Sequence, residues 1–254
     1  MPSFEASDGV AIAYLDQGEG EPLLLIHGFA SSHRVNWQST GWVSAFNEAG
    51  YRVIAPDNRG HGWSDAPHSA DAYGMDRMGR DMLELLDHLG IERTLMMGYS
   101  MGARIATHLA VGAPEKVEAL IIGGLGDQLV QGFGEADEVA AGMRAASTEE
   151  VVGETAKGFR VFAEQTGSDL LALAACMEAG RENLTPGMLG KLTMPVLIVV
   201  GSEDEVAGDP EALAKLIPSA KTAIIPRRDH MRAVGDKMTK AAVLEYLESL
   251  RKAA

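Results

Sequence analysis

The sequence predicts an α/β protein with a mostly parallel, doubly wound sheet and an inserted helical cap. Short apolar runs alternate with segments of helical periodicity toward both ends of the chain. This alternation is typical of βαβ units, whose right-handed crossovers build a parallel sheet. From residue 123 to residue 192 the alternation stops, and only helix-like segments occur. We therefore expect residues 1–122 and 193–254 to form an α/β core and residues 123–192 to form the cap.

Two alternating runs at the start of the chain flank Asp8-Gly9, a pair that favours a hairpin turn. The pattern that follows predicts a strand over 23–26, a helix over 41–48, a strand over 52–55, a helix over 73–89, a strand over 95–97, a helix beyond residue 100 and a strand over 117–122. Because the run over 23–26 is continuously apolar, we expect this strand to be buried on both faces.

Helical spacing continues through the cap, and the strands return after it. The predicted elements are helices over 135–146, 148–164 and 169–179, then a strand over 196–200, a helix near 211–217, a strand over 222–225 and a final helix from about 231 to 251. The cap thus interrupts one sheet, and we expect it to lie over the carboxyl edge of that sheet.

The composition is that of an ordinary globular protein of 254 residues, 46% of them hydrophobic, with a net charge of −14 at pH 7. This charge argues against nucleic acid or an anionic membrane as a partner, because both bind basic surfaces. Cys176 is the only cysteine, so an intrachain disulfide is excluded. The first residues lack a secretory leader pattern, and no apolar run approaches the roughly 18 residues of a membrane span. We expect a cytoplasmic protein.

A serine flanked by glycines follows the predicted strand at 95–97. The stretch reads Gly98-Tyr99-Ser100-Met101-Gly102 and leads directly into a helical segment. A serine at the apex of such a turn has a strained backbone with positive φ, and a Cβ at either glycine would collide with the neighbouring strand or helix. The hydroxyl then points away from the sheet, so Ser100 is the candidate nucleophile.

A nucleophilic serine needs a base, and histidine is the usual base at neutral pH. If serine, acid and histidine follow in that order, only His108 and His230 come after Ser100. His108 lies on the same helix, roughly 12 Å along its axis, and is too far from the hydroxyl. His230 follows the predicted strand at 222–225 and is therefore the candidate base.

The imidazole in turn needs a carboxylate that fixes its tautomer. Asp204 is the candidate, because it lies just beyond the predicted strand at 196–200. Three other acidic residues, Glu203, Glu205 and Asp209, lie near enough to compete. An acid placed after the preceding strand would instead be Asp127. Their positions in the fold decide between them.

Two backbone amides form the candidate oxyanion hole. One belongs to Met101 at the start of the helix, and the other belongs to Phe29 in the loop after the first buried strand. Gly28 in that loop lets the backbone approach the substrate closely. His27 and His61 are interpreted as structural hydrogen-bonding residues of their loops.

Five motifs together make the chain resemble the alpha/beta-hydrolase superfamily. They are His27-Gly28-Phe29, Asp57-Asn58-Arg59-Gly60-His61-Gly62-Trp63-Ser64, Gly98-Tyr99-Ser100-Met101-Gly102, Gly201-Ser202-Glu203-Asp204 and Asp229-His230. The resemblance implies that Ser100, Asp204 and His230 form a catalytic triad, with the Phe29 and Met101 amides as the oxyanion hole. Dehalogenases and epoxide hydrolases of this fold have aspartate where this chain has Ser100, so the serine points to acyl chemistry.

We therefore expect a carboxylesterase-like serine hydrolase that acts on esters of small, mostly apolar acyl groups. The same triad also serves hydrolysis of a carbon–carbon bond or of an enol-lactone. A pocket charged by Arg34, Arg160 or Arg181 would favour these reactions, whereas a dry apolar pocket would favour simple esters. A different interpretation is a non-catalytic ligand receptor on the same fold.

The chain has no His-x-His or HExxH spacing and no dinucleotide-binding glycine pattern, so we expect no metal and no cofactor. The expected partner is a small ester-like molecule, and the oligomeric state stays open. Several aromatic and methionine side chains either line an acyl pocket or belong to the core: Trp37, Phe133, Phe159, Phe162 and Met177.

Overall fold

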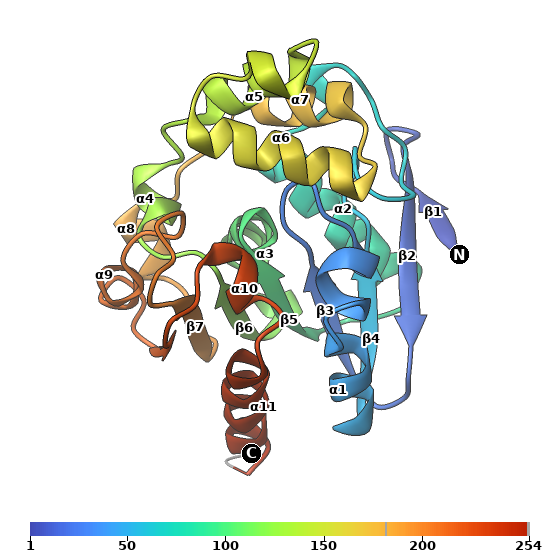
Figure 1. The fold of residues 1–254 in the computed structure, drawn as a ribbon. Coiled ribbons are helices and arrows are strands. Elements are labelled where there is room, and N and C mark those ends of the chain that lie inside the picture. Colours follow the sequence, from blue (N-terminus) through green and yellow to red (C-terminus); the bar gives the residue numbers. More distant parts are fainter. Residues whose placement is uncertain (181, 253–254) are drawn as a thin grey trace.

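The computed structural model describes residues 1–180 and 182–252 and contains an eight-stranded sheet (Figure 1). The strands are β1 (Ser3–Glu5), β2 (Ala11–Gln17), β3 (Glu21–Ile26), β4 (Tyr51–Pro56), β5 (Thr94–Tyr99), β6 (Val117–Gly123), β7 (Val196–Gly201) and β8 (Ala220–Ile225). Their order is β1-β2-β4-β3-β5-β6-β7-β8. The pairings of β1 with β2 and of β2 with β4 are antiparallel, and all pairings from β4 to β8 are parallel. The predicted mostly parallel sheet is confirmed.

Helices cover both faces of the sheet. Successive side chains of a strand point to opposite faces, so a central strand packs against helices on both sides. Leu23 and Leu25 of β3 pack with the apolar side chains of α1 (Trp42–Glu48) and α11 (Lys237–Arg251). Leu24 and Ile26 face the other layer, formed by α2 (Met75–His88) and α3 (Met101–Gly112). Residues 23–26 of β3 are therefore buried on both faces, as their continuous apolar run predicts, whereas β8 at the edge of the sheet is largely exposed.

The shorter helical elements lie in loops and in the segment between β6 and β7. They are η1 (Arg34–Gln38), η2 (Ala70–Ala72), η3 (Pro114–Lys116), α4 (Gln128–Gln131), α5 (Ala136–Arg144), η4 (Thr148–Glu150), α6 (Glu154–Thr166), α7 (Leu170–Glu178), α8 (Pro186–Leu189), α9 (Pro210–Ala214) and α10 (His230–Ala233). In the described part of the chain, no helix combines the length and the apolar character that crossing a membrane requires.

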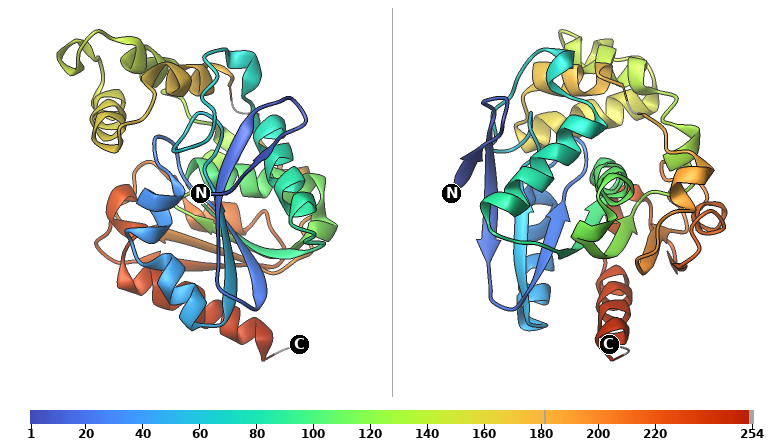
Figure 2. Two further views of the ribbon diagram at one scale, coloured as in Figure 1. Left: turned by 90° about the vertical axis from the view of Figure 1, so that its right-hand side faces the viewer. Right: turned by 180° about the vertical axis from the view of Figure 1, so that it is seen from behind.

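The described residues between β6 and β7 form helices and loops, with α5, α6 and α7 in a layer beyond the carboxyl ends of the strands (Figures 1 and 2). Phe159 of α6 contacts Phe29 of the core edge to face, with ring centroids 5.6 Å apart. We keep the name cap for residues 123–192. Their treatment as a unit distinct from the core stays a prediction.

Two helices are shorter than their periodicity predicts. The final helix is interrupted after α10, and Asp236 caps α11 by accepting a hydrogen bond from the Met238 amide at 2.7 Å. In the cap, Gly153 at φ +87° separates η4 from α6. The sequence does not predict η1, α4 or α8, because so few residues carry little periodicity.

Candidate active site

The candidate nucleophile lies at a topological switch point of the sheet, where the strand order reverses. Strands β4 and β5 lie on opposite sides of β3, so the chain leaves β3 and β5 in opposite directions. Sheets of this type bind ligands in the crevice beyond the strands at such a point. The loop after β3 carries Phe29, and the turn after β5 carries Ser100.

Ser100 has the strained backbone that the sequence predicts, with φ +54° and ψ −116°. A Cβ at Gly98 would collide with the backbone of Gly102, and a Cβ at Gly102 would collide with the carbonyl oxygen of Ile26. Both glycines are therefore required by close backbone approach. The Ser100 amide donates to the carbonyl oxygen of Gly123 at 2.8 Å, which helps to hold the turn.

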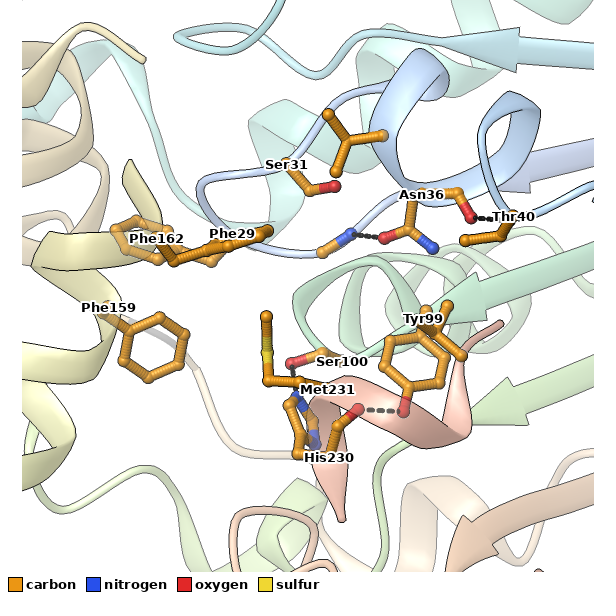
Figure 3. A pocket seen from close by; sticks show the side chains of 13 residues that line it. Phe29, Ser31, Asn36, Thr40, Tyr99, Ser100, Phe159, Phe162, His230 and Met231 are labelled. Carbon is orange, nitrogen blue, oxygen red and sulfur yellow. Dashed lines mark hydrogen bonds between the residues drawn. The ribbon is translucent and has the colours of Figure 1, made fainter. Parts of the chain in front are cut away.

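Three side chains from distant parts of the chain form a series of hydrogen bonds. Ser100 Oγ lies 3.0 Å from His230 Nε2 (Figure 3). His230 Nδ1 lies 3.0 and 2.9 Å from the two carboxylate oxygens of Asp204. With the imidazole proton on Nδ1 and donated to Asp204, Nε2 is the acceptor for the Ser100 hydroxyl. This geometry is what a nucleophile, a base and an orienting acid require.

The carboxylate of Asp204 is fixed by further contacts. Its Oδ1 accepts hydrogen bonds from the amides of Val206 and Ala207 at 3.1 and 2.9 Å, and its side chain is fully shielded from solvent. These amides come from the same loop and orient the carboxylate toward His230.

Asp127, the alternative acid, has other partners. Its Oδ1 accepts a hydrogen bond from the Asp209 amide at 2.8 Å, and its Oδ2 accepts one from Gln131. The structure thus brings Asp204 to His230 and leaves Asp127 at the start of the cap, next to α9.

Tyr99, the residue before the serine, also holds His230. Its hydroxyl donates to the carbonyl oxygen of His230 at 2.6 Å, and its ring lies 5.4 Å from the imidazole (Figure 3). Burial, and secondarily the charge of Asp204, raises the pKa of the Tyr99 phenol well above its ordinary value, so the phenol stays a donor. Sequence reasoning missed this contact, because an apolar residue would fit the same spacing.

The two candidate oxyanion amides belong to residues that line one small cavity with Ser100. Met101 is the first residue of α3, a position whose N–H has no acceptor within the helix. The helix also contributes a positive partial charge there. Phe29 follows Gly28, whose N–H donates to Asn36 Oδ1 at 3.1 Å. Asn36 therefore holds the loop that carries Phe29.

His27 and His61 have structural contacts, as their loop positions predict. His27 is fully buried; its Nδ1 donates to the carbonyl oxygen of Gly28 at 2.8 Å, and its Nε2 accepts from the Asn58 amide at 2.9 Å. Burial lowers the pKa of His27, which favours this neutral ring. The buried ring of His61 packs edge to face against Phe29.

Two cavities meet at Ser100 and differ in size. The smaller, of about 20 Å³, is lined by Phe133, Phe159 and Met177 among others. The larger, of about 210 Å³, lies on the side of His230 and is lined by Phe159, Phe162 and several core residues (Figure 3). Four of the five side chains weighed as pocket residues thus line these cavities; the fifth, Trp37, is buried in the core.

Neither Arg160 nor Arg34 lines the two cavities at Ser100. Arg160 is buried and donates to the carbonyl oxygens of Gly142 and Ala145, and Arg34 lines a polar cleft that adjoins the larger cavity. Arg181 lies outside the described residues. The small cavity does border Arg104, whose guanidinium donates to the carbonyl oxygens of residues 128 and 129 at the start of the cap.

Comparison with known proteins places the chain in a family. A family model described as "alpha/beta hydrolase fold" matches residues 21–152, which is 132 of the 254 residues. An AB hydrolase superfamily protein of Bacillus subtilis (strain 168) is 35% identical over 43% of this chain, but the match covers only 37% of that protein. A non-heme haloperoxidase of Rhodococcus erythropolis is 28% identical over 98% of this chain and 100% of its own length.

Similarity to a solved structure extends over nearly the whole fold. A hydrolase from Pseudomonas aeruginosa is 25% identical, with a TM-score of 0.82 over 97% of each chain. The sheet order, the strained turn at Ser100 and the family match agree with one another. The chain therefore belongs to the alpha/beta-hydrolase family and has the fold of a hydrolase enzyme.

Proposed function

We propose that this protein is a serine hydrolase that cleaves carboxylic esters of small, mostly apolar acyl groups. The observation that carries the proposal is the series of hydrogen bonds from Ser100 through His230 to Asp204, none longer than 3.0 Å. A hydroxyl activated by an oriented imidazole is suited to attack on a carbonyl carbon.

The reaction proceeds through an acyl-enzyme. Ser100 Oγ attacks the ester carbonyl while His230 Nε2 accepts the hydroxyl proton, and the Phe29 and Met101 amides stabilise the resulting oxyanion. His230 then donates that proton to the alcohol oxygen as the carbon–oxygen bond breaks. In the second half, His230 accepts a proton from water, which attacks the acyl carbon, and returns a proton to Ser100 as the acid leaves.

We assign one of the two cavities to the alcohol part of the ester and the other to the acyl part. The alcohol oxygen has to lie within reach of His230, which lines the larger cavity but not the smaller one. The acyl chain then extends into the smaller cavity. A water molecule needs about 10–15 Å³ by the same kind of measure. The volume of about 20 Å³ therefore supports a short acyl group such as acetyl.

Hydrolysis of a carbon–carbon bond or of an enol-lactone would use the same three residues. The arginine that borders the acyl cavity, Arg104, is engaged with backbone carbonyl groups of the cap. Apolar side chains provide most of the remaining lining. These contacts favour simple esters over substrates that need a cationic group.

Replacing Ser100 with alanine tests the proposal. With p-nitrophenyl acetate and butyrate as substrates, we expect kcat to fall by about 10³-fold or more, because the nucleophile is lost. Undiminished hydrolysis by the variant would remove Ser100 from the mechanism. A ligand receptor on this fold would instead leave Ser100 unlabelled by a fluorophosphonate while the protein bound a small molecule tightly.

A further inference from the structure

The larger cavity at Ser100 contains a polar group without a partner. Asn36 of η1 is 5% exposed, and its Oδ1 accepts the Gly28 amide at 3.1 Å. Because this bond requires an acceptor, it identifies the oxygen end of the side-chain amide. The other end, Nδ2, is buried and has no hydrogen-bond partner among the described residues. In Figure 3 this nitrogen points from η1 toward the space beside Tyr99.

The unpartnered amide lies next to the nucleophile. A Cβ built on Gly28 would lie 3.5 Å from Ser100 Cβ and 3.7 Å from Asn36 Oδ1, so Ser100 and Asn36 flank the same point. Ser31 lines the same cavity, and its oxygen is drawn pointing toward Asn36 in Figure 3. The Asn36 amide and the Ser31 hydroxyl are thus two polar groups in the lining of the same cavity.

A buried N–H without an acceptor costs free energy, and that cost is removed when a ligand brings an oxygen to it. A hydrocarbon in the same position would leave the donor unpaired. The larger cavity is on the His230 side, where the alcohol part of the ester is expected under the proposed function. The cavity also shares Ser31, Val35 and Phe162 with a polar cleft of about 670 Å³. The polar cleft therefore adjoins the cavity in which the alcohol part is expected.

We propose that Asn36 Nδ2 donates a hydrogen bond to an oxygen in the alcohol part of the substrate. The preferred substrates are then esters of short acids with alcohols that carry an ether, hydroxyl or carbonyl oxygen close to the ester. This inference rests on the proposed function, because it assigns the alcohol side from the position of His230. It goes beyond that function by naming a specificity-determining residue and the chemistry that the residue selects.

The test compares 2-methoxyethyl acetate with n-butyl acetate. The two esters share the acetyl group and have equal chain lengths, and they differ by one oxygen in place of a methylene group. We expect kcat/KM of the wild-type protein to be about tenfold or more higher for the methoxyethyl ester, because the butyl ester leaves Asn36 unpaired. In Asn36→Asp, assayed at pH 8, an ionised carboxylate keeps the acceptor for Gly28 and loses the donor. The preference should disappear or reverse.

Thr239→Ser is the control. Thr239 of α11 lines neither cavity at Ser100, and its hydroxyl donates to the carbonyl oxygen of Ala233 at 2.7 Å, a bond that serine retains. The ratio of kcat/KM for the two esters should therefore stay at the wild-type value. The ratio is insensitive to a change in the oxyanion loop, since both esters use the same acetyl group.

Each outcome decides a separate question. Serine-dependent hydrolysis of both esters at equal efficiency, or faster hydrolysis of the butyl ester, overturns the inference and leaves the proposed function intact. A preference that survives Asn36→Asp removes Asn36 from the recognition. Absence of Ser100-dependent hydrolysis of either ester contradicts the proposed function itself. If Asn36→Asp does not fold by circular dichroism, the wild-type ratio still decides the preference.

Discussion

His230 has contacts with three residues from two other parts of the chain. Asp204 follows β7, Tyr99 ends β5, and Ser100 lies in the turn beyond it. The candidate triad could be predicted from the sequence because each member follows a strand and has a chemically distinctive side chain. Tyr99 and Asn36 could not, since their contacts depend on side-chain direction rather than on spacing. At the residue scale, the sequence therefore predicts the candidate reacting groups better than the residues that contact and position them.

Exchange of each candidate acid for its amide tests the choice of acid. In Asp204→Asn the imidazole loses the acceptor that fixes its tautomer, and we expect kcat for p-nitrophenyl acetate to fall by about 10⁴-fold. Asp127→Asn is the matched control, because Asp127 contacts Asp209 and Gln131 instead. A larger loss in the Asp127 variant would move the acid to the loop after β6.

Tyr99→Phe removes the hydroxyl that donates to the His230 carbonyl oxygen at 2.6 Å. We expect the free energy of unfolding in urea to fall by about 1–3 kcal/mol, because a buried carbonyl loses its partner. We also expect kcat to fall more than KM changes, since the imidazole is less well positioned. Tyr246→Phe is the control, because that hydroxyl makes no hydrogen bond with the described residues. Equal effects of the two substitutions would exclude the positioning role of Tyr99.

At the scale of elements, two loops at the ends of β3 and β5 determine the geometry of the site. Close backbone contacts in the turn after β5 require glycine at residues 98 and 102. The sequence predicts this turn because the two glycines stand at a fixed, short spacing on either side of Ser100. The interruption between α10 and α11 could not be predicted as readily. Apolar positions continue through it at helical spacing, and only the side-chain cap of Asp236 reveals a new start.

A substitution at Gly102 tests whether close approach explains the turn. Gly102→Ala places a Cβ against the Ile26 carbonyl oxygen, and we expect a loss of soluble, folded protein. Gly79→Ala is the matched control, because a Cβ at this position in α2 meets nothing within 4 Å. It should stabilise the protein by about 0.5–1 kcal/mol through higher helix propensity. Folded, active Gly102→Ala protein would contradict the steric explanation.

The buried His27 predicts how stability depends on pH. Burial lowers its folded pKa below the ordinary value of 6.5, so near that pH the unfolded chain binds more protons than the folded protein. The free energy of unfolding should therefore decrease as the pH falls from 7 toward 5. Burial also lowers the pKa of His108, which acts in the same direction. Urea unfolding of wild type and His27→Gln at pH 7, 6 and 5 should show a weaker pH dependence in the variant.

At the scale of the whole molecule, the cap contacts the core next to the candidate oxyanion hole. Thr166 of α6 donates to the carbonyl oxygen of Ala30 at 3.0 Å, and Phe159 packs on Phe29. The sequence predicts that helices are inserted between β6 and β7, because strand patterns are absent there. It does not predict which cap residues reach the site, since that depends on how the helices pack over the sheet.

Substitutions at Phe159 and Phe162 test which cavity holds the acyl chain. Phe159 lines both cavities at Ser100, whereas Phe162 lines the larger one and not the smaller one. Phe159→Ala should enlarge the acyl cavity and raise the kcat/KM ratio of p-nitrophenyl octanoate to acetate. Phe162→Ala should leave this ratio near the wild-type value. Equal ratios in both variants would contradict the assignment of the smaller cavity to the acyl chain.

The most direct test of the central claim is the site of covalent modification by a fluorophosphonate. We expect intact-mass spectrometry to show one adduct per chain, and peptide mapping to locate it on Ser100. The adduct should be absent from Ser100→Ala and strongly slowed in His230→Ala, because the imidazole accepts the proton of the attacking hydroxyl. Wild-type protein that stays unmodified, or an adduct on any other residue, would contradict the account.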